Sequence, residues 1–395
     1  MSRLWYGSAF VLIAAVALYG MHHYVWARWV RDVRPSRRLK LAGTLAVFVL
    51  AALVIAAFAF GRRGIGEARY WLALSGYTWL GVLFYAVLVL GALDLVRMLL
   101  HRSRRTRSRA VELESPSRRR FLARSVAGSA AFGAGGIALT GVRGATGEIL
   151  TPEIPVALER LPSALSGFRI AHLSDLHMGP LLHERFLSTV VERTNALRPD
   201  LVVITGDMVD ASVEALGREL APLAKLQARC GVAFVTGNHE YYSGAEEWIA
   251  FLRSRGIRVL QNERVAIGDR TLGGATFDLA GVPDAHAVSH PSGGPDLARV
   301  LVGRDPEREL VFLAHQPVQI ASAEGLGVGL QLSGHTHGGQ MWPFGLLVGL
   351  VQPYVAGLHR HHDGTQIYVS RGTGFWGPPM RVGNPAEIAS IVLHR

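Results

Sequence analysis

Five short polar motifs, each directly after an apolar run, carry the residues best suited to chemistry. The motifs span Ser174–His177, Gly206–Asp210, Gly237–Glu240, Ala314–Pro317 and Ser333–Gly339. Together they supply carboxylate, amide and imidazole groups at Asp175, His177, Asp207, Asn238, His315, His335 and His337. This mixture of hard oxygen and nitrogen ligands suits Mn²⁺, Fe or Zn²⁺. Seven ligands are too many for one ion and enough for two ions that share a bridging residue.

Spacing within the motifs supports a common cluster. Asp175 and His177 are two residues apart, as are His335 and His337. In an extended chain, residues two apart project to the same side, so each pair is expected to reach one site. Glycines within the motifs permit tight turns and a close approach of backbone to a ligand.

The elements that position these motifs follow an alternating pattern. Apolar runs at 168–173, 201–205 and 232–236 predict strands, and amphipathic segments at 182–197, 213–227 and 245–255 predict helices. Alternating strands and helices indicate an α/β fold. Ligands of such folds gather at the carboxyl ends of the strands, where the motifs lie. Strands after residue 257 mostly lack intervening helices, which predicts a second, partly antiparallel sheet.

The ordered set D-x-H, G-D-x-x-D, G-N-H-E, H and G-H-T-H resembles the signature of the calcineurin-like metallophosphoesterase superfamily. The resemblance covers roughly residues 165–395. The phrases GNHEYYSG, SGHTHGGQ and SRGTG…RVGNPAEI look like its bacterial branch, which contains membrane-anchored and twin-arginine-exported phosphodiesterases. The fold that this resemblance implies is a four-layer α/β/β/α sandwich.

The resemblance also implies roles for the site residues. One ion would be held by Asp175, His177, Asp207 and His337. The other would be held by Asp207, Asn238, His315 and His335, so that Asp207 bridges the two. Two such cations share a water, lower its pKa and produce a hydroxide that attacks phosphorus.

Two further residues of the motifs receive roles. The resemblance makes His239 the catalytic histidine, which donates a proton to the leaving oxygen or stabilises it. Asp210 is expected either to orient a histidine or to close the turn after its strand, and we favour the orienting role.

Four apolar stretches occupy the N-terminal part, at about 4–20, 41–60, 70–93 and 125–142. A membrane span needs about 20 apolar residues. We therefore expect an all-α transmembrane region of about four helices before the sandwich. The expected domains are a multi-pass membrane region (1–116), a signal with the fourth span (117–147), and the metallophosphoesterase domain (148–395).

Basic residues in the loops predict the orientation. Six Lys and Arg lie in 27–40 and nine in 97–120, against three in 61–69. The positive-inside rule makes the first two loops cytoplasmic and places everything after about residue 143 outside. Ser117–Leu122 (SRRRFL) resembles an internal twin-arginine export signal. The expected location is the plasma or inner membrane, with the catalytic domain extracytoplasmic.

The charge distribution opposes a nucleic-acid partner. Residues 1–147 carry 21 Lys and Arg against 5 Asp and Glu, a balance of +16, whereas residues 148–395 carry −5. Binding to phosphate backbones requires clustered Lys and Arg, which the C-terminal part lacks. The formal net charge of +11 therefore reports membrane topology.

The apolar stretch Trp342–Val351 follows the last motif directly. It could be buried core, which we favour, or a lip that faces lipid or an acyl chain.

The function predicted on these grounds is metal-dependent phosphoester hydrolysis, with phosphodiesters favoured over monoesters. A lipid or another cell-envelope component is a candidate substrate. A first alternative is a lipid-linked pyrophosphate hydrolase of the UDP-acylglucosamine type. A second is a non-catalytic membrane sensor that retains a phosphoesterase shell, which the complete ligand set disfavours.

Overall fold

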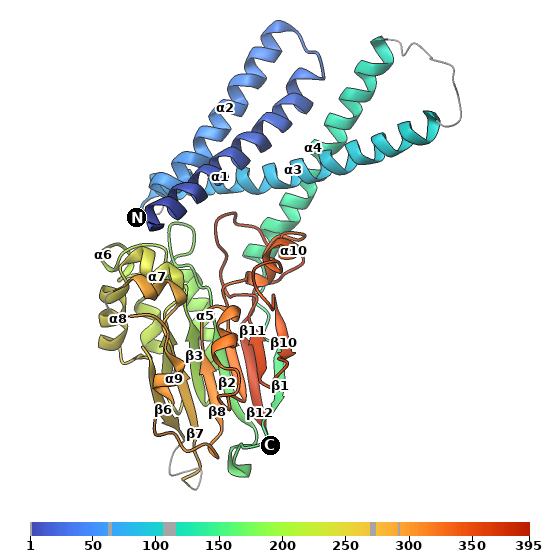
Figure 1. The fold of residues 1–395 in the computed structure, drawn as a ribbon. Coiled ribbons are helices and arrows are strands. Elements are labelled where there is room, and N and C mark those ends of the chain that lie inside the picture. The colour runs from blue at the N-terminus through green and yellow to red at the C-terminus, as the bar shows by residue number, and fades with distance from the viewer. Residues whose placement is uncertain (1, 62–64, 106–115, 269–273, 291–292) are drawn as a thin grey trace. The chain divides into compact units, whose positions relative to one another are not determined.

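The structure, a computed structural model, describes residues 2–61, 65–105, 116–268, 274–290 and 293–395. The chain divides into two compact units, which we describe separately (Figure 1). The helical unit comprises Met1–Phe60 and Trp71–Val142. The sandwich unit comprises Gly61–Tyr70 and Arg143–Arg395, so it includes the connection between the second and third helices.

Long helices make up the helical unit: α1 (Ser2–Trp26), α2 (Arg37–Phe60), α3 (Glu67–Arg105) and α4 (Pro116–Thr146). A short π-helical segment, Ala27–Arg31, follows α1. Within the described residues, three helical segments are long and apolar enough to cross a membrane. They are 37–60, 67–100 and 120–146, with mean hydropathies of 2.6, 2.2 and 1.3. The predicted span at 4–20 lies in α1, but the side chains of residues 1–10 are outside the described ones.

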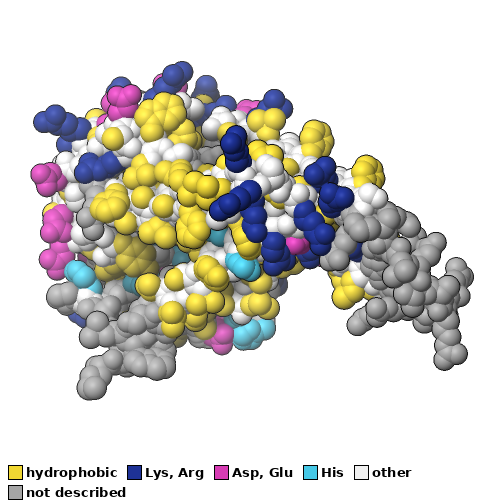
Figure 2. Space-filling view, turned by 90° about the horizontal axis from the view of Figure 1, so that it is seen from above, with side chains coloured by type: hydrophobic (Ala, Val, Ile, Leu, Met, Phe, Trp, Pro, Cys, Tyr) yellow, Lys and Arg dark blue, Asp and Glu magenta, His cyan; other side chains and the backbone are white. Residues whose placement is uncertain are grey.

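Much of the surface of these helices is hydrophobic. Large apolar side chains of α1 to α4 are exposed, among them Ile13, Phe48, Trp71 and Phe132. In the space-filling view, hydrophobic side chains cover much of the visible face and Lys and Arg side chains gather beside them (Figure 2). Exposed apolar helix surfaces of this kind are typical of segments that meet lipid.

A small polar network joins the end of α1 to α3. The Tyr24 hydroxyl donates to Asp94 Oδ2 at 2.5 Å, and Arg28 Nη2 lies 2.6 Å from the same oxygen. Trp79 Nε1 donates to His22 Nε2 at 3.0 Å. These pairs fix the two helices against each other by directional contacts as well as by packing.

Two six-stranded sheets form the sandwich unit. The first has the order β1-β12-β2-β3-β4-β5 and is parallel except where β12 meets β2. Its strands are β1 (Glu153–Ala157), β12 (Ala389–His394), β2 (Phe168–Leu173), β3 (Leu201–Thr205), β4 (Val232–Val235) and β5 (Arg258–Val259).

The second sheet has the order β10-β11-β9-β8-β7-β6. Its central strands are parallel, and its two edge strands, β10 and β6, run antiparallel to their neighbours. The strands are β10 (Gly357–Arg360), β11 (Gln366–Val369), β9 (Leu330–Ser333), β8 (Leu310–Leu313), β7 (Phe277–Gly281) and β6 (Glu263–Ile267). The predicted second, partly antiparallel sheet is therefore confirmed.

Buried side chains connect four layers. One cluster between the sheets combines Ile170 and Val203 of the first sheet with Leu279 and Val311 of the second. The outer face of the first sheet is covered by α5 (Glu184–Ala196), α6 (Val213–Leu216) and α8 (Ala245–Ser254). The second sheet carries α9 (Leu297–Val300) on its outer face. The α/β/β/α sandwich expected from the sequence is confirmed.

One predicted helix is divided. Residues 213–227 form α6, which ends at Leu216, and a separate 3₁₀ turn over Ala221–Lys225. Gly217 follows α6 directly, and Pro222 lies at the start of the second turn. Glycine favours termination of a helix, and proline lacks the amide hydrogen that a continuing helix would need.

Strand register brings the five motifs to one edge of the sandwich. In the first sheet, β2, β3 and β4 are parallel neighbours, so their carboxyl ends lie side by side. The same holds for β8 and β9 in the second sheet. Backbone bonds continue beyond the strands: Asp175 N donates to Gly206 O at 3.1 Å, and Gly334 N to His315 O at 2.9 Å.

The packing of α8 provides a test of the fold. Trp248 is fully buried, and its indole nitrogen donates to Ala211 O at 3.0 Å. Trp248→Ala should cost about 3–5 kcal/mol of unfolding free energy, because it leaves a cavity and an unpaired carbonyl. We expect the melting temperature of the sandwich unit to fall by on the order of 10 °C. Val302→Ala, at an exposed position, is the control, and equal shifts for the two variants would contradict the assigned packing.

Candidate metal centre

The structure brings the seven predicted ligand residues together. Two groups of ligand atoms, each within 4.8 Å of one another, are formed by Asp175, His177 and His337 and by Asp207, His315 and His335. Asn238 joins the second group, since its Oδ1 lies 3.2 Å from His315 Nε2. Each of these residues follows one of the strands β2, β3, β4, β8 and β9.

The backbone of the ligand loops differs from the expected extended form. Asp175 and His177 have φ angles of 54° and 47°, and His335 and His337 have 69° and 52°. Left-handed backbone is unfavourable for residues with a side chain, and strained residues of this kind cluster at functional sites. The premise that these pairs lie in extended chain was wrong. Their convergence comes from turns at the strand ends.

Two glycines make room for the carboxylates. A Cβ atom on Gly237 would lie 2.2 Å from Asp207 Oδ1, and one on Gly334 would lie 2.3 Å from Asp175 Oδ2. Any side chain at either position would displace a buried carboxylate. We expected these glycines to let backbone approach a ligand closely; in the structure the room that they leave is taken by buried carboxylates.

In the second group, lone pairs converge on one point. His315 Nδ1 donates to the carbonyl oxygen of Thr205 at 2.7 Å, which leaves Nε2 of a neutral ring without a hydrogen. That nitrogen lies 3.1 Å from Asp207 Oδ2, 3.2 Å from Asn238 Oδ1 and 3.1 Å from His335 Nδ1. A lone pair directed at a carboxylate and an amide oxygen is repelled unless a proton or a metal cation lies between them.

The first group shows the same pattern. His177 Nδ1 donates to Asp210 Oδ1 at 3.0 Å, so Nε2 of the neutral ring carries a lone pair. This nitrogen faces His337 Nε2 at 3.1 Å, and His337 Nε2 lies 3.5 Å from Asp175 Oδ1. His337 Nδ1 is buried without a hydrogen-bond partner among the described residues. Imidazole and carboxylate donors that converge in a dry site fit a divalent metal ion.

The electrostatics of the buried cluster also call for positive charge. Burial would lower the pKa of His315, but the adjacent Asp207 carboxylate raises it well above its ordinary value. Burial would raise the pKa of Asp207, but the charges of His315 and His239 hold it well below its usual range. Burial raises the pKa of Asp175 and lowers that of His335 to about 4. Asp207 is thus held as an anion, the pKa of His315 beside it favours the charged imidazole, and His335 resists protonation.

Asp210 orients two histidines. Its Oδ1 accepts from His177 Nδ1 at 3.0 Å and from His239 Nδ1 at 2.5 Å. Although burial opposes the charge on Asp210, these two rings hold its pKa below the usual range. His239 Nε2 is thereby directed toward Asp207 Oδ2, 4.0 Å away. The favoured sequence interpretation of Asp210 agrees with this geometry, which extends it to a second ring.

Sequence reasoning missed Glu240 as the brace of the Asp207 loop. Its carboxylate accepts from the backbone nitrogens of Gly237, Asp207 and Met208 at 2.6, 3.0 and 2.8 Å. Burial and the nearby Asp207 charge raise the pKa of Glu240 to about 7. The signal was present, because Glu240 ends the G-N-H-E motif.

Arg381 was also missed, and it braces the loop after β11. Its guanidinium is buried and donates to the carbonyl oxygens of Gly372, Gly374 and Asn384. Burial lowers its pKa to about 10. A Cβ atom on Gly372 would lie 3.2 Å from His337 Nδ1, so this loop forms one wall of the first ligand group.

Two further polar residues near the motifs, Arg371 and Asp284, have structural partners. Arg371 Nη1 pairs with Glu387 Oε2 at 2.7 Å. Asp284 is fully buried, where it accepts from His286 N and from Gln316 Nε2, both at 2.8 Å. Because Gln316 follows His315 directly, Asp284 supports the metal loop from behind while it caps its own turn.

A separate cluster lies at the amino ends of β9 and β11. Glu324 is 3.0 Å from His361 Nε2 and 3.5 Å from His362 Nε2. The His362 side chain is 68% exposed, whereas the His361 side chain is only 11% exposed. We interpret these contacts as ion pairs that stabilise the end of the β10–β11 hairpin. This end is remote from the carboxyl ends of the strands, where the predicted ligands lie.

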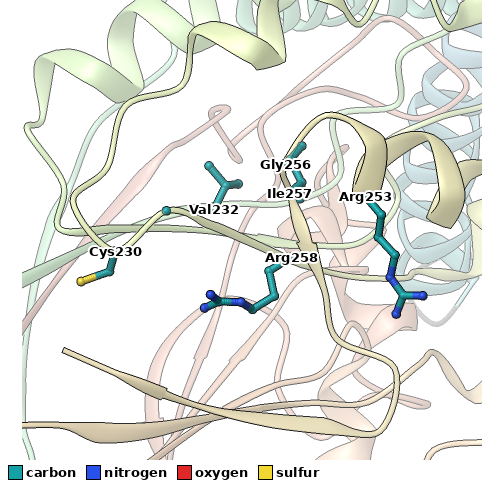
Figure 3. Close-up of a pocket in the computed structure, with 7 residues that line it drawn as sticks. Cys230, Val232, Arg253, Gly256, Ile257 and Arg258 are labelled. Carbon is teal, nitrogen blue, oxygen red and sulfur yellow. The ribbon is translucent and has the colours of Figure 1, made fainter. Parts of the chain in front are cut away.

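A pocket of about 300 Å³ lies away from the ligand cluster (Figure 3). It is lined by Cys230, Gly231, Val232, Arg253, Gly256, Ile257 and Arg258. These residues are at the beginning of β4 and around β5, whereas the ligands follow the carboxyl ends of the strands. The pocket therefore contains none of the predicted site residues.

Comparisons with known proteins agree with this site. The family model "Calcineurin-like phosphoesterase" matches residues 168–339, which include all five motifs. The chain is 32% identical over 382 residues to a Danio rerio "Transmembrane protein with metallophosphoesterase domain", covering 94% of this chain and 85% of that protein. A Bos taurus protein of the same name is 34% identical over 398 residues, with the same coverage. An "Uncharacterized metallophosphoesterase" of Helicobacter pylori is 42% identical over 242 residues, which are 61% of this chain and 63% of that protein.

The chain belongs to the calcineurin-like phosphoesterase family, and it is a phosphoester hydrolase. The family uses divalent metals, and the structure contains His and Asp groups that are able to bind them.

The shared contact at Asp210 generates a prediction. Asp210→Asn removes the charge that orients His177 and His239, so activity or metal affinity should fall about 10- to 100-fold. The measurement is kcat/KM together with metal content per chain, and Asp363→Asn on the β10–β11 hairpin is the matched control. Unchanged values for Asp210→Asn would exclude the orienting role.

Proposed function

We propose that the sandwich unit hydrolyses phosphodiesters with a dinuclear metal centre in a domain held outside the cytoplasmic membrane. The observation that carries the proposal is the convergence of two buried donor groups on either side of Asp207. Asp207 Oδ2 lies 3.1 Å from His315 Nε2 in one group and 4.0 Å from His177 Nε2 in the other. One carboxylate is thus able to serve both ions.

Each of the two groups of ligand residues would hold one ion, and Asp207 would belong to both. Asp175, His177, Asp207 and His337 would hold one ion. Asp207, Asn238, His315 and His335 would hold the other. When bound, two divalent cations activate a water and neutralise charge on the phosphoryl oxygens.

His239 would act on the leaving group. Its Nδ1 donates to Asp210, which fixes the ring and leaves Nε2 as the atom that holds or releases a proton. The backbone nitrogen of His239 donates to Asp207 Oδ1 at 2.8 Å, which ties the histidine to the centre of the cluster. A proton held at Nε2 would be donated to the departing oxygen.

The partners of two arginines beside the ligand loops, Arg371 and Arg381, support a diester substrate. Arg371 is paired with Glu387, and Arg381 is committed to backbone carbonyls. A phosphomonoester carries a second negative charge near neutral pH, whereas a diester carries one. Because both arginines are already paired, neither is available to neutralise the second negative charge of a monoester. The single charge of a diester therefore suits the site better.

Two connections support the proposal that the α2–α3 loop and the catalytic domain lie on the same side of the membrane. Ile65 of that loop packs against the buried cluster beneath α5 and α8, and the Tyr70 ring lies 6.1 Å from that of His183. The end of α4 also enters the sandwich unit. The positive-inside rule then places both outside. The twin-arginine-like segment lies at the start of α4, although the side chains of Arg118 and Arg119 are outside the described residues.

An amphiphilic substrate is the second candidate. The exposed apolar stretch beside the metal loop favours a lipid-linked phosphoester, including a lipid-linked pyrophosphate, over a purely soluble one. A non-catalytic sensor is disfavoured, because every proposed ligand and His239 are in place.

Asp207 provides the test of the chemistry. We expect the full chain in detergent, supplied in turn with Mn²⁺, Zn²⁺ and Fe²⁺, to cleave an aryl phosphodiester faster than the matching monoester. Asp207→Asn should lower kcat/KM by more than about 100-fold. Loss of a residue that only hydrogen-bonds to a metal ligand already costs about 10- to 100-fold. Asp363→Asn is the control. Cleavage that survives Asp207→Asn, or a chain that binds no metal, would refute the proposal.

The topology is tested by thiol labelling. Cys230 is the sole cysteine, so Cys230→Ser gives a cysteine-free chain. A cysteine added after Arg395 should react with a membrane-impermeant thiol reagent in intact cells. Ser108→Cys, in the loop expected to be cytoplasmic, should react only after permeabilisation. The reverse pattern would place the catalytic domain inside and would favour the lipid-linked pyrophosphate alternative.

A further inference from the structure

The stretch Trp342–Val351, here named the apolar lip, lies on the surface. The favoured expectation that it is buried core was wrong: Leu346, Leu350 and Val351 are 71%, 79% and 74% exposed. Only one helical turn forms within it, α10 (Gly345–Val348), and none of the α10 residues is buried.

The sequence of the lip contains no charged residue that would favour its exposure to water. From Met341 to Gly357 the sequence contains no Asp, Glu, Lys, Arg or His. Contiguous exposed apolar patches are uncommon on soluble proteins and mark surfaces that meet a partner or a membrane.

Backbone contacts fix the base of the lip to the metal loop. A Cβ atom on Gly339 would lie 2.3 Å from Gly345 Cα, so these two backbone segments are in direct contact. Thr336 Oγ1, between His335 and His337, donates to Val355 O at 2.6 Å just beyond the lip. Whatever the lip binds is therefore held beside the ligand cluster.

The base of the lip also lies close to the end of α4. Trp342 N donates to Val382 O at 3.0 Å. The preceding residue, Arg381, is in contact with Gly144, where a Cβ atom would lie 2.3 Å from Arg381 O. Gly144 belongs to the last turns of the candidate span 120–146. If that segment crosses the bilayer, its end marks the membrane–water boundary, and the lip begins next to it.

We propose that the apolar lip inserts into the lipid bilayer that anchors the chain, and that it presents the metal cluster to phosphoesters of membrane amphiphiles. This inference rests on the proposed phosphoesterase function and names its substrate class. Insertion of exposed leucines and valines to a depth of about 5–10 Å is the usual mode of interfacial apolar segments. Trp342, at the base, is of the residue type that is enriched at that boundary.

Lipid fits the lip better than a second copy or a partner protein. The anchor keeps the sandwich unit at a bilayer at all times, and the lip begins within one residue of the backbone that touches α4. A phosphoester whose apolar part stays in the membrane would reach the cluster without leaving the bilayer surface.

Environment-sensitive labelling tests the insertion directly. In a Cys230→Ser chain, we compare Leu350→Cys with Val302→Cys, because Leu350 and Val302 are 79% and 78% exposed. Each variant carries an NBD label, and the full chain is reconstituted in vesicles of phosphatidylethanolamine and phosphatidylglycerol. We expect blue-shifted emission and quenching by nitroxide-labelled lipids at position 350, and a solvent-like signal at 302.

Two results would overturn the inference. A solvent-like signal at position 350 would show that the lip stays in water. Blue-shifted emission that nitroxide lipids fail to quench would show that protein, such as a second copy, covers the lip. Neither readout depends on catalysis, so both remain informative if the proposed function fails.

A substrate comparison tests the substrate class. The wild-type chain is given a soluble aryl phosphodiester and a vesicle-borne, headgroup-labelled phospholipid. Leu346→Ser with Leu350→Ser should lower the ratio of vesicle-borne to soluble cleavage at least tenfold, and Val302→Ser should leave the ratio unchanged. An unchanged ratio in the lip variant would overturn the substrate class alone. Wild-type protein that cleaves neither substrate would instead refute the phosphoesterase proposal.

Discussion

The convergence of buried lone pairs around Asp207 is the constraint on which the rest of the sandwich depends. Oxygen and nitrogen donors repel one another in a dry site unless positive charge joins them. The surrounding structure holds them there. Glu240 clamps the Asp207 loop through three backbone nitrogens, and Gly237 and Gly334 leave room for the carboxylates. Parallel register in both sheets then brings loops that are far apart in the chain to one edge.

The same constraint explains the division of labour among the histidines. His315 and His177 each donate through Nδ1 to an acceptor, a carbonyl oxygen and Asp210, so that Nε2 is the atom that faces the cluster. His239 uses the same Asp210 contact, and its Nε2 lies 4.0 Å from Asp207 Oδ2. One carboxylate thus sets the orientation of two rings: His177 in the ligand cluster, and His239, which we propose acts on the leaving group.

Much of this was predictable from the sequence. Polar motifs after apolar runs identified the strand ends, and parallel strands required those ends to meet. The left-handed backbone at Asp175 and His177 was not predictable from spacing, because these turns are held by contacts with the loop that follows β3, far away in the sequence. Arg381 was missed because its partners are backbone carbonyls, which leave no pattern of complementary residue types. The apolar lip was wrongly expected to be buried core. A hydrophobic sequence indicates that a segment avoids water, but it does not indicate whether protein or lipid covers the segment.

The α2–α3 connection gives the sandwich unit a boundary that the linear sequence hides. Ile65 packs on the cluster that contains Leu187 and Trp248, although more than a hundred residues and two helices separate it from them. A fragment that starts at residue 148 therefore lacks part of its own packing and leaves apolar surface bare. The sandwich unit is discontinuous in sequence, because it takes up Gly61–Tyr70 from between α2 and α3 as well as the chain from Arg143 onward.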